Sequence, residues 1–175
     1  CVDGCCTPQG QCLDFAQQDP DSCGQEGMCM TCTGDDSCIG GTCSADPAWV
    51  IIIDSAILSD EDENGSDWDT SFFSSALPDA YVTGALTKDV VVDWFTETVP
   101  DTITPNWDEA VSSYAQSDLI GEGLEFNVLD DDGLILFETI GNCIMTITID
   151  DLNAGTKTIP CGPLVQALTI DFAQQ

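Results

Sequence analysis

Nine of the eleven cysteines lie within the first 43 residues, and this clustering restricts the fold more than any other feature of the chain. A segment this short, rich in Cys, Gly, Gln and Asp, cannot bury enough apolar surface to fold unaided. It therefore predicts a disulfide-stapled module from an oxidising, extracellular compartment. The cysteines that we expect to form its disulfides are Cys5, Cys6, Cys12, Cys23, Cys29, Cys32, Cys38 and Cys43. Their spacing does not fix the connectivity.

Zinc is the alternative explanation for these cysteines, suggested by the run Cys29-Met30-Thr31-Cys32. A structural zinc site needs a second matched pair of ligands, and the chain has no histidine. Disulfides are the better prediction.

The odd number of cysteines leaves one without an intramolecular partner. Cys143 and Cys161 lie outside the cysteine-rich segment and could pair with each other. Cys1 is then the natural unpaired residue, with two roles open to it. It could carry a lipid anchor after signal cleavage, or it could bond to another subunit. No apolar run is long enough to span a membrane, so we expect a secreted protein, extracellular or held at the cell surface.

The charge balance excludes whole classes of partner. The chain has 32 acidic residues, two lysines and no arginine, for a net charge of −30. Nucleic acids and anionic lipids both bind cationic protein surfaces, which this chain lacks. Neither is therefore an expected partner. Such a chain repels itself unless counter-ions, especially divalent ones, gather on it. Hydrophobic residues make up 43% of the sequence, which favours a folded protein over an acidic tail.

Catalysis is not predicted. The chain has neither histidine for acid–base chemistry nor arginine for stabilising an anionic transition state, and its cysteines are expected in disulfides.

The composition changes near Pro47, so we predict a cysteine-rich module over residues 1–46 and a β-sheet domain over 47–175. Strand-like runs cover 49–53 and 56–58, 80–82, 90–95, 110–114, 124–129, 143–149 and 164–172. The last two alternate apolar with polar residues, as half-buried antiparallel strands do. Short strands separated by turn signals predict an all-β antiparallel sandwich.

Acidic residues follow one of these strands. Asp130 and Asp132 close the run 124–129, and Glu138 comes shortly afterwards. Like charges on one loop raise its free energy unless a cation offsets them. Calcium takes six to eight oxygen ligands, so a calcium site is predicted here.

Three motifs, in order, resemble the C2 domain family. They are 55–58 with 62–65 and 77–82, then Thr102-Ile103-Thr104-Pro105-Asn106-Trp107-Asp108-Glu109, then Val128-Leu129-Asp130-Asp131-Asp132 with Glu138 ahead of Ile140-Gly141. They span most of residues 48–172. The resemblance implies an eight-stranded antiparallel β-sandwich with Ca²⁺ bound at one end. It does not extend to the cysteine-rich module, which resembles small disulfide modules of secreted bacterial proteins.

The resemblance also implies which residues bind calcium. Asp79, Asp130 and Asp132 stand at ligand positions of the family, and Asp62 matches the remaining first-loop aspartate. Glu138 stands where the family usually has Asp.

The first loop departs from the family pattern, because a long insertion precedes Asp79. Asp67 or Asp69 could therefore replace Asp62 as the ligand. The insertion begins Asp60-Glu61-Asp62-Glu63-Asn64-Gly65, like an EF-hand loop, which adds Asp60 and Asn64 as candidate ligands. Its twelfth position is Ser71 instead of a bidentate Glu, and no helices are expected around it, so a complete EF-hand is not predicted.

Two apolar stretches flank the predicted site. They consist of Phe72 and Phe73, and of Leu134, Ile135, Leu136 and Phe137. If exposed, they would form a patch that contacts a neighbouring subunit, the cysteine-rich module or a neutral membrane; simple packing is the alternative.

These observations predict a secreted, non-catalytic calcium-binding protein for extracellular assembly or adhesion, such as a matrix, surface-layer or filament subunit. Its expected partner is another copy of itself or another extracellular protein. The alternative is a calcium-dependent membrane-binding C2 protein that inserts the apolar stretches into neutral lipid. With only two lysines, the chain lacks the basic groove with which some C2 domains bind phosphoinositides, which weakens that alternative.

Overall fold

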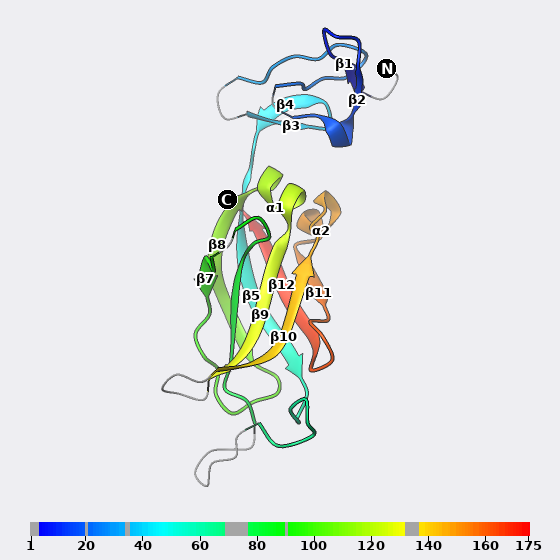
Figure 1. Ribbon diagram of the computed structural model, residues 1–175. Coiled ribbons are helices and arrows are strands. Elements are labelled where there is room, and N and C mark those ends of the chain that lie inside the picture. Colours follow the sequence, from blue (N-terminus) through cyan, green and yellow to red (C-terminus); the bar gives the residue numbers. More distant parts are fainter. Residues whose placement is uncertain (1–3, 20, 34–35, 69–76, 90, 132–136) are drawn as a thin grey trace. The chain divides into compact units, whose positions relative to one another are not determined.

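The computed structural model describes residues 4–19, 21–33, 36–68, 77–89, 91–131 and 137–175. The chain divides into two compact units, Cys1–Pro47 and Ala48–Gln175 (Figure 1). Within the described residues, no helix is both long and apolar enough to cross a membrane.

The N-terminal unit consists of two small β-hairpins and one turn of 3₁₀ helix. The elements are β1 (Gly4–Cys6), β2 (Cys12–Asp14), η1 (Phe15–Gln17), β3 (Asp36–Ile39) and β4 (Thr42–Ala45). Strand β1 pairs with β2, and β3 pairs with β4.

Disulfides hold this unit together. They join Cys5 to Cys29, Cys23 to Cys38, and Cys32 to Cys43, and Cys6 and Cys12 are also disulfide-bonded. Both Cys5 and Cys23 are fully buried. Sulfur therefore occupies the interior that apolar side chains fill in a larger domain. Cys1 lies outside the described residues, so its predicted role stays a prediction.

The C-terminal unit is an antiparallel β-sandwich of two four-stranded sheets, which confirms the predicted fold. Its strands are β5 (Ala48–Leu58), β6 (Ala80–Leu86), β7 (Trp94–Phe95), β8 (Asn106–Ala115), β9 (Leu124–Asp131), β10 (Phe137–Met145), β11 (Thr156–Ile159) and β12 (Val165–Gln174). One sheet has the order β10-β9-β6-β7 and the other β11-β12-β5-β8. Two short helices, α1 (Gln116–Glu122) and α2 (Ile149–Ala154), complete the unit.

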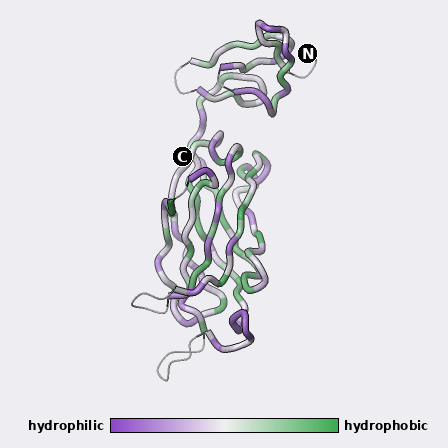
Figure 2. Tube along the Cα trace, viewed as in Figure 1, coloured by the Kyte–Doolittle hydropathy of each residue, from purple (hydrophilic) through white to green (hydrophobic). Residues whose placement is uncertain are grey.

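The core lies between the two sheets because buried residues alternate with exposed ones along the strands. In β9, Leu124, Phe126 and Val128 are fully buried, and in β5 Ile51 and Ile53 are. Figure 2 shows this alternation of hydrophobic and hydrophilic residues along the strands. A disulfide joins Cys143 in β10 to the buried Cys161.

Two predicted strands differ from the observed ones. The strand expected over 143–149 ends at Met145, and Ile149 begins α2. Thr148 caps that helix, since its side chain accepts a hydrogen bond from the Asp151 N–H and the Asp151 carboxylate accepts one from the Thr148 N–H. Of the strand expected over 90–95, the described residues contain only Trp94–Phe95.

Three connections leave the same end of the sandwich, opposite to the end where β5 begins (Figure 1). We call them loop 1 (residues 59–79), loop 2 (96–105) and loop 3 (131–137). Residues 69–76 and 132–136 of these loops lie outside the described residues. Every predicted metal ligand belongs to loop 1, to loop 3 or to the strand ends beside them.

Candidate metal centre

Asp130 is a buried carboxylate at the loop end of β9, with only 1% of its surface exposed. It continues the inward-facing series Leu124, Phe126 and Val128, so the strand's own alternation turns its side chain toward the interior. Ala80, the first residue of β6, pairs with Asp130 across the sheet. The Asp79 N–H, one residue earlier, donates a 2.6 Å hydrogen bond to Asp130 Oδ1.

The Asp79 carboxylate is held from loop 2. Its Oδ1 accepts a 2.8 Å hydrogen bond from the N–H of Asp101, a residue with a left-handed backbone (φ 58°). The Asp79 carbonyl accepts a 3.0 Å bond from the N–H of Asp131. The backbone around Asp79 thus joins the loop ends of β6 and β9 to loop 2.

Two further acidic residues adjoin this pair. Glu138 lies opposite Asp130 in the β9–β10 register and is exposed. Asp131 is exposed, and its Oδ2 accepts a 3.3 Å bond from the Thr98 hydroxyl. Burial raises the pKa of the Tyr81 hydroxyl, and the negative charge of Asp131 raises it further.

The described residues do not by themselves form a calcium site. Within them, no group of three carboxylates stands close enough together to hold a metal ion. The predicted ligands Asp132 and Asp69 lie outside the described residues. The oxygens of Asp79, Asp130 and Glu138 are hard donors of the kind that calcium prefers, so the chemistry of these residues suits the ion, whereas their spacing alone does not form a site.

The EF-hand-like segment of loop 1 forms a turn of its own. Asp62 Oδ1 accepts 2.8 Å hydrogen bonds from the N–H groups of Asn64 and Ser66, and the Ser66 bond is the main cause that lowers the Asp62 pKa. Trp68 is buried, and its indole N–H donates to the Ser59 carbonyl at 3.0 Å. The turn is therefore closed by its own side chains, and strand β5 precedes it where an EF-hand has a helix. Asp60, like Asn64, is exposed on this turn.

Asp101 was not predicted from the sequence. Its contribution is a backbone N–H, which any residue except proline provides. The available signal was the dipeptide Pro100-Asp101, which is typical of a turn.

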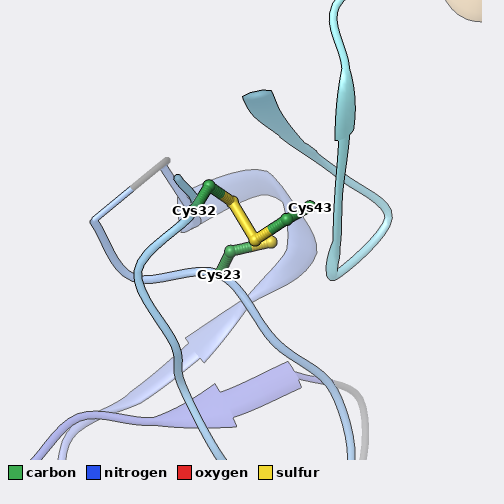
Figure 3. A group of neighbouring side chains, drawn as sticks. All are labelled: Cys23, Cys32 and Cys43. Carbon is green, nitrogen blue, oxygen red and sulfur yellow. A yellow bond between two sulfur atoms is a disulfide. The ribbon is translucent and has the colours of Figure 1, made fainter. Parts of the chain in front are cut away.

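Three cysteine sulfurs gather in the N-terminal unit, but they do not form a metal centre. The sulfurs of Cys23, Cys32 and Cys43 lie within 4.8 Å of one another (Figure 3). Cys32 is bonded to Cys43, and Cys23 to Cys38, so two disulfides lie side by side. Disulfide sulfur is not the thiolate that zinc requires. The zinc alternative rested on Cys29 and Cys32. Because Cys29 is bonded to Cys5 and Cys32 to Cys43, neither offers a thiolate to zinc.

The predicted contact residues of the loop tips lie beyond what the structure describes. Phe72, Phe73, Leu134, Ile135 and Leu136 are outside the described residues, and Phe137 begins β10 without a described side chain.

Comparison with known proteins decides the family. A family model described as C2 domain matches residues 51–160. The chain belongs to the C2 domain family. This confirms the resemblance seen in the sequence, and the matched region includes Asp79, Asp130 and Glu138.

Solved structures share the fold of this C2 chain. The first C2 domain of a plant extended synaptotagmin 1 superposes with a TM-score of 0.53 at 16% identity, over 74% of this chain and 94% of that one. Human GIVD cytosolic phospholipase A2 gives 0.53 at 17% identity, over 75% of this chain but only 17% of the phospholipase. A calcium-bound structure of a pair of C2 domains from extended synaptotagmin 2 gives 0.51 at 13% identity, over 74% and 45%. No curated protein matches the sequence.

Proposed function

We propose that this C2 protein is secreted, binds Ca²⁺ at the loop end of its sandwich, and serves extracellular assembly or adhesion without catalysing a reaction. One observation carries the proposal: the Asp130 carboxylate is buried at the loop end of β9, and the backbone N–H of a second acidic residue, Asp79, holds it there. Burying a carboxylate raises its free energy unless it is paired with donors or a cation. A divalent cation would offset both charges.

Calcium would be held by Asp79, Asp130 and Glu138, together with Asp132 of loop 3. Asp69, Asp67 or Asp62 would supply the ligand from loop 1. Bound calcium would supply positive charge that neutralises the loop end and draws loops 1 and 3 together. It would also stabilise the folded state, by an amount that rises with the logarithm of the calcium concentration.

The disulfides support the secreted location. The described part of the N-terminal unit includes the three linked pairs given above, and the sandwich contains Cys143–Cys161. Disulfides persist in oxidising compartments and are rare in the cytosol. We infer that residues 1–46 and 47–175 are separate domains.

Calcium would permit assembly because it offsets charge. Subunits with a net charge of −30 repel one another, and calcium bound at the sandwich end would reduce this repulsion where the loops meet a neighbour. A contact between the cysteine-rich module of one copy and the sandwich of the next would propagate into a filament.

Calorimetric titration with CaCl₂ is the first test, with MgCl₂ as the comparison ion. We expect calcium to bind the wild-type protein and to bind Asp79→Asn more weakly. Asp150→Asn is the matched control, because it makes the same charge change on α2 at the other end of the sandwich. Equal calcium binding by all three proteins would disprove the site.

Sedimentation then separates assembly from membrane binding. The protein is centrifuged with calcium or with EGTA, and with or without phosphatidylcholine vesicles. Pelleting with calcium alone supports assembly. Pelleting that needs both calcium and vesicles would replace the assembly proposal with membrane binding by the loop tips.

A further inference from the structure

The outer face of the sheet β10-β9-β6-β7 carries a trough that the calcium proposal does not use. Residues at alternate positions share a face, and the register places two rows on the face opposite the core. One row contains Phe95, Thr83, Asn127 and Asn142. The other contains Ala85, Glu125 and Ile144.

Apolar side chains rise on both sides of this trough. On the β7 side, Phe95 is 71% exposed and the preceding Val91 is 74% exposed, with Val92 beside it at 51%. On the β10 side, Ile144 is 65% exposed. Between them, the side chains of Thr83 and Ala85 in β6 are small, so the surface is lower there than at Phe95 and Ile144. Exposed apolar side chains grouped along an edge strand indicate a surface that contacts another molecule.

A cavity of about 110 Å³ opens in the trough, and its polar lining is mainly acidic. Asp89 and Glu125 line it together with Val91, Val92 and Asn127. The Asn142 side-chain amide donates to Glu125 Oε1 at 3.2 Å and to Asn127 Oδ1 at 2.8 Å. These bonds fix the Glu125 and Asn127 side chains.

Both lysines of the chain are in ion pairs with other carboxylates, and the sequence has no arginine. The Lys88 ammonium lies 2.7 Å from the Asp118 carboxylate, and the Lys157 ammonium lies 2.8 Å from that of Asp151. A cavity with acidic and apolar walls is complementary to the long apolar stem and charged head of a lysine or arginine.

We propose that this trough binds an extended, cationic segment of another protein. A lysine or arginine of that segment enters the cavity toward Asp89 and Glu125, and apolar residues on either side of it contact Val91, Val92 and Phe95. A second copy fits poorly, because both of its lysines are in ion pairs and its net charge is −30. The site is separate from the calcium ligands, so its test does not depend on calcium.

Fluorescence anisotropy tests the proposal with a short labelled peptide of the repeat Val-Ser-Lys-Ser, in which valine and lysine share one face of the extended chain. The measurement is made in EGTA and about 150 mM salt, where the Debye length is about 8 Å, so that general attraction to the acidic chain is screened. We expect the double variant Asp89→Asn/Glu125→Gln to lower affinity about tenfold or more, since paired charges at an interface are among its stronger contacts. The control double variant Glu63→Gln/Asp150→Asn removes the same charge elsewhere, and its affinity should stay within about twofold of wild type.

Equal weakening by the two double variants would mean nonspecific attraction to the net charge and would overturn the proposal. Phe95→Ser should also weaken binding, and circular dichroism with thermal melting checks that it folds. If it does not fold, Val91→Ser replaces it. Sedimentation equilibrium tests whether a second copy of the chain occupies the trough instead. Self-association of the wild type that is lost in Phe95→Ser, or in Val91→Ser where that replaces it, would assign the trough to a second copy and overturn the proposal.

Discussion

Asp79 and Asp130 are joined by a 2.6 Å hydrogen bond from the backbone of the first to the carboxylate of the second. The bond places two acidic side chains from distant parts of the sequence at one end of the sandwich. It also explains how a buried carboxylate is tolerated in the folded chain, because a backbone donor offsets part of its desolvation. A cation at this position would offset more.

The substitution Asp130→Asn separates the charge of this side chain from its shape. The oxygen of the introduced amide can still accept from the Asp79 N–H, so the calcium-free protein should fold, with a stability equal to or above that of wild type. Calcium should no longer raise the melting temperature, whereas saturation of the wild type at about 100 times its dissociation constant stabilises it by about 2.7 kcal/mol. Thermal melting with CaCl₂ and with EGTA measures both effects.

The Asp130→Ala variant provides the contrast. It removes the acceptor as well as the charge and leaves the Asp79 N–H without this partner, which should cost about 1–3 kcal/mol even in EGTA. If the Asn and Ala variants had the same stability without calcium, the hydrogen bond would not have the role assigned to it.

Gly84 in β6 is required by the close approach of Trp94. A Cβ at position 84 would lie 2.3 Å from the indole ring and 2.8 Å from the Glu125 carbonyl. The ring would have to move, and Gly84→Ala should therefore destabilise the protein by about 1–3 kcal/mol in urea unfolding. Gly121→Ala is the control, since it has open space and lies in α1. It should be neutral or stabilising by up to about 1 kcal/mol, and equal losses for the two variants would contradict this account.

The sandwich could be predicted because its strands alternate in the sequence as they do in space. Leu124, Phe126 and Val128 indicate the buried face of β9, and the acidic residues that follow indicate its loop end. Position-by-position resemblance to C2 domains then selects Asp79, which no local pattern would have singled out. In the structure, the hydrogen bond between Asp79 and Asp130 connects this residue to another predicted ligand. The full ligand set remains a prediction.

Other features could not be predicted, for physical reasons. The short helix α2 interrupts an alternating run because the capping box at Thr148 and Asp151 outweighs the strand pattern. The disulfide partner of Cys29 depends on the tertiary path of a segment with little regular structure. Asp101 acts through its backbone, so the identity of its side chain gives no signal.

A buried polar pair fixes α1 to the sandwich. The Trp49 indole N–H donates to Gln116 Oε1 at 3.2 Å, and both side chains are buried. Gln116→Ala would leave the indole donor without this acceptor and should cost about 1–3 kcal/mol in urea unfolding. Trp49→Phe combined with Gln116→Ala removes both polar groups, so the double variant should lose less than the sum of the single losses. Additive losses would argue against the bond.

The pH dependence of stability should show the contribution of Asp151. The Lys157 ammonium, followed by the Thr148 hydroxyl, lowers the Asp151 pKa from 3.8 to about 2. Because the folded-state pKa lies below the unfolded one, this contribution is fully present above about pH 4 and is lost as the pH falls through about 2. The group is partly in water, which screens its ion pair, so we expect Asp151→Asn to cost only about 1 kcal/mol at pH 5. Urea unfolding at pH 5 and at pH 2 measures the difference, with Asp150→Asn as the control for the general loss of charge. The gap between wild type and Asp151→Asn should narrow at pH 2, and a gap of unchanged size would show that the carboxylate charge is not its source.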